Sequence, residues 1–207
     1  TKINMKISYA VTVCNEINEI KELIPFLLKN KEKKDEVVVL FDKGKGTAEV
    51  WSYLQTQKII AHAETFKHHF ADWKNKLTEL CSGDYIFQID ADEIPNEFLM
   101  KNLKTILSHN LHNEVFLVPR VNTVKGLTEE HIKKWGWRVD DNDWINWPDL
   151  QWRIWKNDSK IQWINKVHER LNGFKTYSPL PLREEVALYH HKTIKRQEEQ
   201  NDYYDTL

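Results

Sequence analysis

Cysteine, glycine and proline are all scarce in this chain. Its 207 residues include 2 cysteines, 6 glycines and 6 prolines. Two cysteines are too few for a disulfide framework, and Cys14 and Cys81 both stand in apolar contexts, which predicts buried thiols in a reducing, cytoplasmic compartment. No stretch is rich enough in Gly, Ser or Pro to mark a linker, so we expect one domain over residues 1–207.

An excess of charge and long apolar runs are also missing. The chain carries 30 Lys+Arg against 31 Asp+Glu, a formal net charge of −1, which argues against broad electrostatic binding of nucleic acid or anionic membrane. No apolar run approaches the roughly 20 residues of a membrane span, and no signal-peptide pattern opens the chain. Because it lacks an initial Met and ends just after an expected helix, it could be a domain of a longer protein.

Strand-like and helix-like segments alternate over the first 120 or so residues. Runs of β-branched and aromatic residues, typical of strands, cover 6–13, 36–41, 58–63, 84–90 and 114–121. Helical spacing of apolar residues covers 16–29, 47–57, 70–81 and 95–109. We expect Pro25 to kink or end the first helix early, and Pro95 to lie in the first turn of the fourth. Apolar strands that alternate with helices predict an α/β fold, a mostly parallel sheet with helices on both faces.

The pattern changes after about residue 122. Segments 151–156 and 160–167 alternate like short strands, which we expect to be antiparallel and packed at one edge of the sheet, and 193–204 is patterned as a charged helix. The sequence therefore predicts two halves, 1–121 and 122–207, the second a small Trp-rich antiparallel part. Seven of the nine tryptophans fall in it: Trp135, Trp137, Trp144, Trp147, Trp152, Trp155 and Trp163.

Acidic residues follow three of the predicted strands. Ligands of open parallel sheets bind outside the carboxyl ends of the strands, where Glu16, Asp42 and the segment Asp90-Ala91-Asp92 stand. Glu16 could instead complement a helix dipole, and Asp42 could be a turn residue before glycine. The acids of Asp90-Ala91-Asp92 leave a buried strand together, and such a pair suits a hard divalent cation. Gly44 and Gly46 match neither a dinucleotide fingerprint nor a P-loop.

In these motifs the chain resembles the nucleotide-sugar glycosyltransferases of the GT-A fold, in particular the family-2-like group and its short stand-alone viral and bacterial members. The resemblance is carried by residues 12–16, by Asp42, by 71–76 leading through 82–85 into 90–93 and, less specifically, by 166–169. It implies a GT-A-like fold and roles for several residues. Asp42 would bind the nucleobase, Asp90 the ribose, and Asp92 a Mn²⁺ or Mg²⁺ ion that bridges the diphosphate.

The resemblance also implies further contacts to the donor. Thr12, Asn15 and Glu16 would help to bind the nucleotide sugar, and Lys76, or Lys74 before it, would contact the phosphates. The alternative for the lysines is a solvated helix face.

Histidines of the second half could complete a metal site. His190 is our first choice for a further metal ligand and His168 the second, while a packed or capping histidine is the alternative for each.

An inverting transfer needs a general base that takes the proton of the acceptor hydroxyl. We assign this role to Asp149, flanked by aromatic residues, with Glu169 and Asp143 as competitors. Arg153 could pair with phosphate or with an acid such as Asp149.

Indole rings stack on the apolar faces of sugars. We expect Trp144 and Trp147, with Trp135 and Trp137, to form a wall for the acceptor, while Trp152 and Trp155 pack under the sheet edge.

The sequence thus predicts a metal-dependent glycosyltransferase that moves a sugar from a nucleoside-diphosphate sugar, with UDP-sugar favoured, to a carbohydrate acceptor. One alternative is a sugar-phosphate nucleotidyltransferase, although the glycine-rich basic loop that it would need after the first strand is missing. A non-enzymatic carbohydrate-binding module is the other, and it would leave the strand-end acids unexplained.

Overall fold

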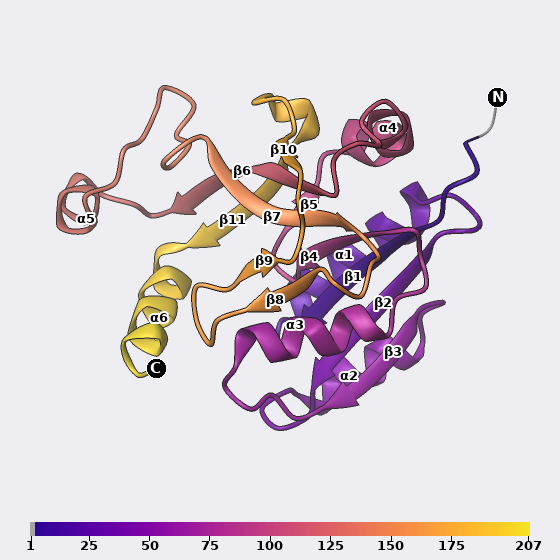
Figure 1. The fold of residues 1–207 in the computed structure, drawn as a ribbon. Coiled ribbons are helices and arrows are strands. Elements are labelled where there is room, and N and C mark those ends of the chain that lie inside the picture. The colour runs from indigo at the N-terminus through magenta and orange to yellow at the C-terminus, as the bar shows by residue number, and fades with distance from the viewer. Residues whose placement is uncertain (1–2) are drawn as a thin grey trace.

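The computed structural model describes residues 3–207, which form a curled sheet flanked by helices (Figure 1). In chain order the elements are β1 (Ile7–Val13), α1 (Ile17–Asn30), β2 (Glu36–Asp42), α2 (Ala48–Gln55), β3 (Ile60–Glu64), α3 (Phe70–Glu79), β4 (Tyr85–Asp90), β5 (Ile94–Pro95), α4 (Glu97–Ser108), β6 (Val115–Lys125), α5 (Glu129–Trp135), β7 (Asp149–Lys156), β8 (Gln162–Ile164), β9 (Arg170–Asn172), β10 (Tyr177–Pro179), a 3₁₀ turn (Glu184–Val186), β11 (Leu188–Thr193) and α6 (Ile194–Asp205). No helix within residues 3–207 is long and apolar enough to cross a membrane.

The main sheet has nine strands in the order β3-β2-β1-β4-β7-β6-β11-β5, with β10 paired to β6. The pairs β1–β2, β1–β4 and β2–β3 are parallel, as are the pairs of β11 and β10 with β6. Strand β7 runs antiparallel to β4 and β6. The predicted α/β fold with a mostly parallel sheet is confirmed.

Each face of the sheet has its own apolar core, because successive residues of a strand point to opposite faces. Tyr9 and Val11 of β1 pack with the buried residues of α1, α2 and α4. Ala10 faces the other way and packs with α3 and with the hairpin β8–β9, which also contributes Trp163. The helices therefore cover both faces, and α3 lies with the hairpin β8–β9 on the side opposite α1 and α2 (Figure 1).

Pro25 lies inside α1, which continues to Asn30, so the early end that the sequence allowed as one outcome does not occur. Its side chain is exposed, while Ile20, Leu23, Ile24 and Leu27 of the same helix are buried. The carbonyl that loses its partner faces solvent, and packing of the apolar face holds the helix together.

Pro95 is also placed differently from the prediction. It belongs to the short strand β5, which pairs with Leu188 of β11, and α4 begins after it, with the Asn96 side chain as N-cap. Pairing with a strand almost a hundred residues away outweighs the local preference of proline for a first helical turn.

The segment 151–156 is antiparallel, as predicted, but its expected edge position is wrong. Strand β7 lies between β4 and β6. Ile154 packs into one core and Trp155 into the other, and burial of successive residues on both faces is typical of an inner strand.

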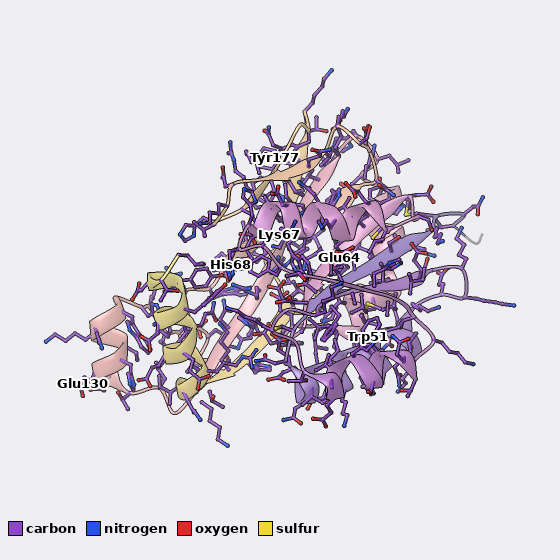
Figure 2. The ribbon with its side chains drawn as sticks, turned by 90° about the horizontal axis from the view of Figure 1, so that it is seen from below. Trp51, Glu64, Lys67, His68, Glu130 and Tyr177 are labelled. Carbon is purple, nitrogen blue, oxygen red and sulfur yellow. The ribbon has the colours of Figure 1, made fainter. Side chains whose placement is uncertain are left out.

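Residues 126–148 leave the sheet between β6 and β7 and carry α5, which the sequence patterns did not predict. Helix α5 has no buried residue and is closed by a capping box at Thr128 and by Gly136 in the left-handed region. It lies beside α6, where His131 contacts Glu198 at 3.5 Å. Figure 2 shows Glu130 of α5 at the opposite end of the molecule from Trp51 of α2.

Candidate active site

The acids of the first half meet at the carboxyl edge of the parallel strands. Thr12 of β1 pairs with Asp90 of β4, and Asp42 closes β2. A cavity of about 390 Å³ opens beside β4, with Asp90 and Asp92 in its wall. Its other side includes residues of the second half of the chain, such as His190, Gln200 and Tyr204.

Asp90 is held ionised by buried partners. Arg153 Nη2 donates to its Oδ2 at 3.0 Å, and Gln88 Nε2 donates to its Oδ1 at 3.0 Å. Burial by itself would raise the pKa of Asp90, but the charge of Arg153, with that of Lys74, lowers it well below the usual range. The carboxylate is therefore charged and fixed in orientation at neutral pH.

Arg153 does not pair with Asp149, one of the partners considered from the sequence. It is 3% exposed and donates to Asp90 and to Glu93, which is fully buried. Glu93 also accepts from Arg120 Nη1 at 2.8 Å. A row of alternating charges thus links the donor-side acid Asp90 to Arg120.

Asp149 lies at the far end of that row. Its Oδ2 accepts from Arg120 Nε (2.9 Å) and from Asn122 Nδ2 (2.7 Å), and its Oδ1 accepts from Gln151 Nε2 (2.7 Å). Burial tends to raise the pKa of Asp149, but Arg120 and the hydrogen bonds lower it. One lone pair of Oδ1 stays available to a hydroxyl, so this carboxylate can accept a proton.

Asp92 and His190 form a contact between the halves. His190 Nε2 lies 3.0 Å from Asp92 Oδ2, and the imidazole is buried. Within residues 3–207, no group of three or more His, Cys, Asp or Glu side chains is arranged to hold a metal ion. One carboxylate oxygen and one imidazole nitrogen, side by side at a cavity wall, nevertheless fit two positions of a Mn²⁺ or Mg²⁺ shell whose other ligands would come from diphosphate and water. His168 is exposed and takes no part in this contact.

Four of the residues assigned to the donor, Thr12, Asn15, Glu16 and Asp42, do not line this cavity. Asp42 is buried, and its Oδ1 accepts from the backbone of Gly44 and Phe66. Glu16 accepts from the backbone of Cys14, and burial raises its pKa. Asn15 is exposed at the start of the same turn.

The structure brings Lys74 to the cavity and leaves Lys76 on the solvent side of α3. Lys74 lines the cavity, pairs with Glu169 at 2.7 Å and lies 4.2 Å from the centre of the Trp163 ring. Lys76 is 43% exposed and only approaches Glu64, at 4.0 Å. The buried face of α3 includes Trp73, Lys74 and Leu77, and Lys76 falls outside that face.

A second cavity, of about 260 Å³, adjoins the first. Arg120, His190, Lys192 and Gln200 line both, Asp149 lines only the second, and Asp90 and Asp92 line only the first. Asp143, the other competitor for the base, is exposed and lines neither cavity.

The tryptophans divide between core and cavities. Trp155 and Trp163 are buried in the core beside α3, and Trp152 and Trp163 also border the first cavity. Trp137 is the indole at the second cavity. The predicted acceptor residues Trp144 and Trp147 pack edge to face on each other, with ring centres 4.9 Å apart, and line neither cavity.

Sequence reasoning missed several residues of the cavity walls, four of which lie in the first cavity and come from its far side. Arg120, Lys192, Gln200 and Tyr204 come from β6, β11 and α6. Lys192 and Gln200 hydrogen-bond to each other across the turn from β11 into α6. None has a local motif, so only the pairing of β11 with β6 and the docking of α6 reveal them.

We expect Arg153→Met to lower the free energy of unfolding by about 3–5 kcal/mol, because it takes the shared partner from the buried Glu93 and the half-buried Asp90. Urea denaturation followed by circular dichroism measures this loss. Arg170→Met is the matched control, since Arg170 is exposed and should change stability by no more than about 0.5 kcal/mol. Equal stability of the two variants would show that Arg153 does not hold the acids.

Comparisons with known proteins show the fold and the family of this chain. Solved structures of S. aureus TarS residues 1–349 share the fold. The structure described only as TarS 1–349 has a TM-score of 0.60 and 18% sequence identity, and the match covers 90% of this chain and 60% of that one. The complex of TarS 1–349 with UDP-GlcNAc has a TM-score of 0.62 and 17% sequence identity, and the match covers 91% of this chain and 59% of that one. This chain therefore spans about three fifths of the length of these structures. No curated protein matches it. The family model described as Glycosyl transferase family 2 matches residues 8–178, so the chain belongs to glycosyl transferase family 2, as the sequence motifs predicted.

Proposed function

We propose that this chain is a metal-dependent glycosyltransferase that transfers a sugar from a nucleoside-diphosphate sugar to a carbohydrate acceptor. The observation that carries the proposal is the pair of adjoining cavities, with Asp90 and Asp92 in one and Asp149 in the other. The family supports the reaction class, and the TarS complexes with UDP-GlcNAc and UDP support a UDP-sugar as donor.

The first cavity takes the ribose, the diphosphate and the sugar of the donor, and the base reaches past its wall. Asp42 binds the base, with Thr12, Asn15 and Glu16 beside it, and Asp90 accepts from the ribose. Asp92 and His190 hold the divalent cation, which when bound neutralises charge on the leaving diphosphate. Lys74 takes the phosphate contact first assigned to Lys76, because Lys74 lines the cavity and Lys76 does not.

The second cavity takes the acceptor. Asp149 is kept ionised by Arg120 and is placed to accept the proton of the attacking hydroxyl, which leads to inversion at the anomeric carbon. Trp137 offers an indole face to the sugar, and polar side chains such as Asn146 and Gln197 offer hydrogen bonds. Glu169 is less suited to act as the base, because it lines the donor cavity and forms an ion pair with Lys74, with 2.7 Å between Oε1 and Nζ.

A thermal-shift series with UDP, GDP, ADP and CDP, each with Mn²⁺, tests the donor proposal. We expect UDP to raise the melting temperature most, by roughly 5–10 °C at a hundred times its Kd, because a ligand that binds only the folded state stabilises it by about 2.7 kcal/mol. A chelator should abolish the metal-dependent part. If no nucleoside diphosphate shifts the melting temperature at millimolar concentration, the chain has no such donor site.

A further inference from the structure

Asn122 lies between the acid of the acceptor cavity and the imidazole of the donor cavity. It is on β6, directly opposite His190 of β11 in the parallel register. Its Nδ2 is 2.7 Å from Asp149 Oδ2, and its Oδ1 is 2.8 Å from His190 Nδ1. One amide thus touches the acid of the acceptor cavity and an imidazole that lines both cavities.

The chemistry of the two partners fixes the orientation of this amide. The ionised Asp149 can only accept, so the NH₂ group of Asn122 must face it. The carbonyl oxygen then faces the imidazole, and His190 Nδ1 must carry a hydrogen to donate to it.

The tautomer of His190 follows. With the hydrogen on Nδ1, a neutral ring turns the lone pair of Nε2 toward Asp92 Oδ2, 3.0 Å away. Two acceptors that face each other at this distance repel unless a cation lies between them or the ring gains a proton. Without Asn122 the ring could place its hydrogen on Nε2 and donate to Asp92, and that hydrogen would occupy the space that a cation needs.

We infer that Asn122 is a positioning residue that holds His190 in the Nδ1–H tautomer and thereby keeps the Nε2 lone pair and Asp92 open to a divalent cation. This inference rests on the proposed function only in naming the cation. The other end of the amide fixes Asp149, so Asn122 ties the acid of the acceptor cavity to the cation-binding pair.

Two variants separate the two ends of the amide. Asn122→Leu removes both hydrogen bonds at nearly the same volume. Asn122→Asp keeps an acceptor for His190 Nδ1 but sets a negative charge against Asp149. The control Asn102→Leu replaces an amide that bonds only to the Phe98 carbonyl of its own helix.

The tautomer is read from the ¹⁵N shifts of the imidazole in a long-range ¹H–¹⁵N spectrum of the metal-free protein in alkaline buffer, with His190→Gln identifying the signal. We expect Nδ1–H in the wild type, in Asn122→Asp and in Asn102→Leu, and Nε2–H in Asn122→Leu. An unchanged tautomer in Asn122→Leu, or Nε2–H in the wild type, overturns the inference. This readout needs neither donor nor turnover, so failure of the proposed reaction would not imitate it.

Mn²⁺ affinity, measured by electron paramagnetic resonance of the free ion, provides the second readout. Loss of a residue that orients a metal ligand typically lowers affinity 10–100-fold, and we expect this for Asn122→Leu. Asn122→Asp should retain affinity within a few-fold of the wild type. Equal affinity of Asn122→Leu and the wild type overturns the inference, as does a loss of the same size in Asn102→Leu.

Discussion

Asp149→Asn is expected to lower the turnover of sugar transfer about 10²–10⁴-fold, the usual contribution of a general base, while leaving UDP binding unchanged. The carboxylate lines the acceptor cavity and not the donor cavity, so its loss removes the proton acceptor and spares the nucleotide site. The variant can fold, since the asparagine oxygen can still accept from Arg120 and Asn122. Gln151, which contacts the other oxygen, can rotate its amide to accept instead. Initial rates of UDP release and isothermal titration with UDP measure the two effects.

Two competing acids are the comparison for this variant. Asp143→Asn is the control, because Asp143 is exposed and lines neither cavity, and it should retain wild-type turnover. Glu169→Gln should weaken the donor site by releasing Lys74, and so raise KM for the donor more than it lowers kcat. Full turnover in Asp149→Asn would move the base to Glu169 or Asp143.

Asp92→Ala is expected to lower turnover about 10³-fold by removing the carboxylate that faces His190. A bound cation contributes several kcal/mol to the transition state, and each 1.36 kcal/mol is a factor of ten in rate. Initial rates over a range of Mn²⁺ concentrations measure the loss. We expect that added Mn²⁺ does not restore the wild-type rate, because His190 alone is a weak ligand.

Asp72→Ala is the matched control, since Asp72 is an exposed aspartate in the first turn of α3. It should keep both the wild-type rate and its dependence on Mn²⁺. Asp92→Ala with a wild-type rate would remove this residue from the mechanism.

The strands that end at Asp42 and Asp90, the second followed by Asp92, could be predicted because their signals are local. Each is a buried apolar run that ends in an acid, and parallel strands bring such ends to one edge. The contact of Asp92 with His190 spans 98 residues and depends on β11 pairing with β6, a register that no local pattern specifies. His190 was predicted from the chemistry that metals need, while Asn122, its partner on β6, has no such signal.

At two places the predicted residues lie away from the cavities, for simple physical reasons. Lys74 and Lys76 look alike in sequence, but the helical period sets Lys74 on the face with Trp73 and Leu77 and turns Lys76 to solvent. The helical period, applied to the sequence, favours Lys74 over Lys76 for the phosphate contact. Trp144 and Trp147 were assigned to an acceptor wall by composition, yet they lie in the segment between β6 and β7 and pack on each other. Trp137 borders the second cavity instead. The segment has no repeating pattern from which this could be predicted.

The central claim, that Asp92 helps to hold a divalent cation for a nucleoside diphosphate, is tested most directly by isothermal titration of UDP into the wild type and Asp92→Ala. Each protein is titrated with Mn²⁺ and again with a chelator. The account predicts that Mn²⁺ tightens binding of UDP to the wild type at least 10-fold and has no such effect in Asp92→Ala. Equal Kd values for the wild type with Mn²⁺ and with the chelator would contradict it.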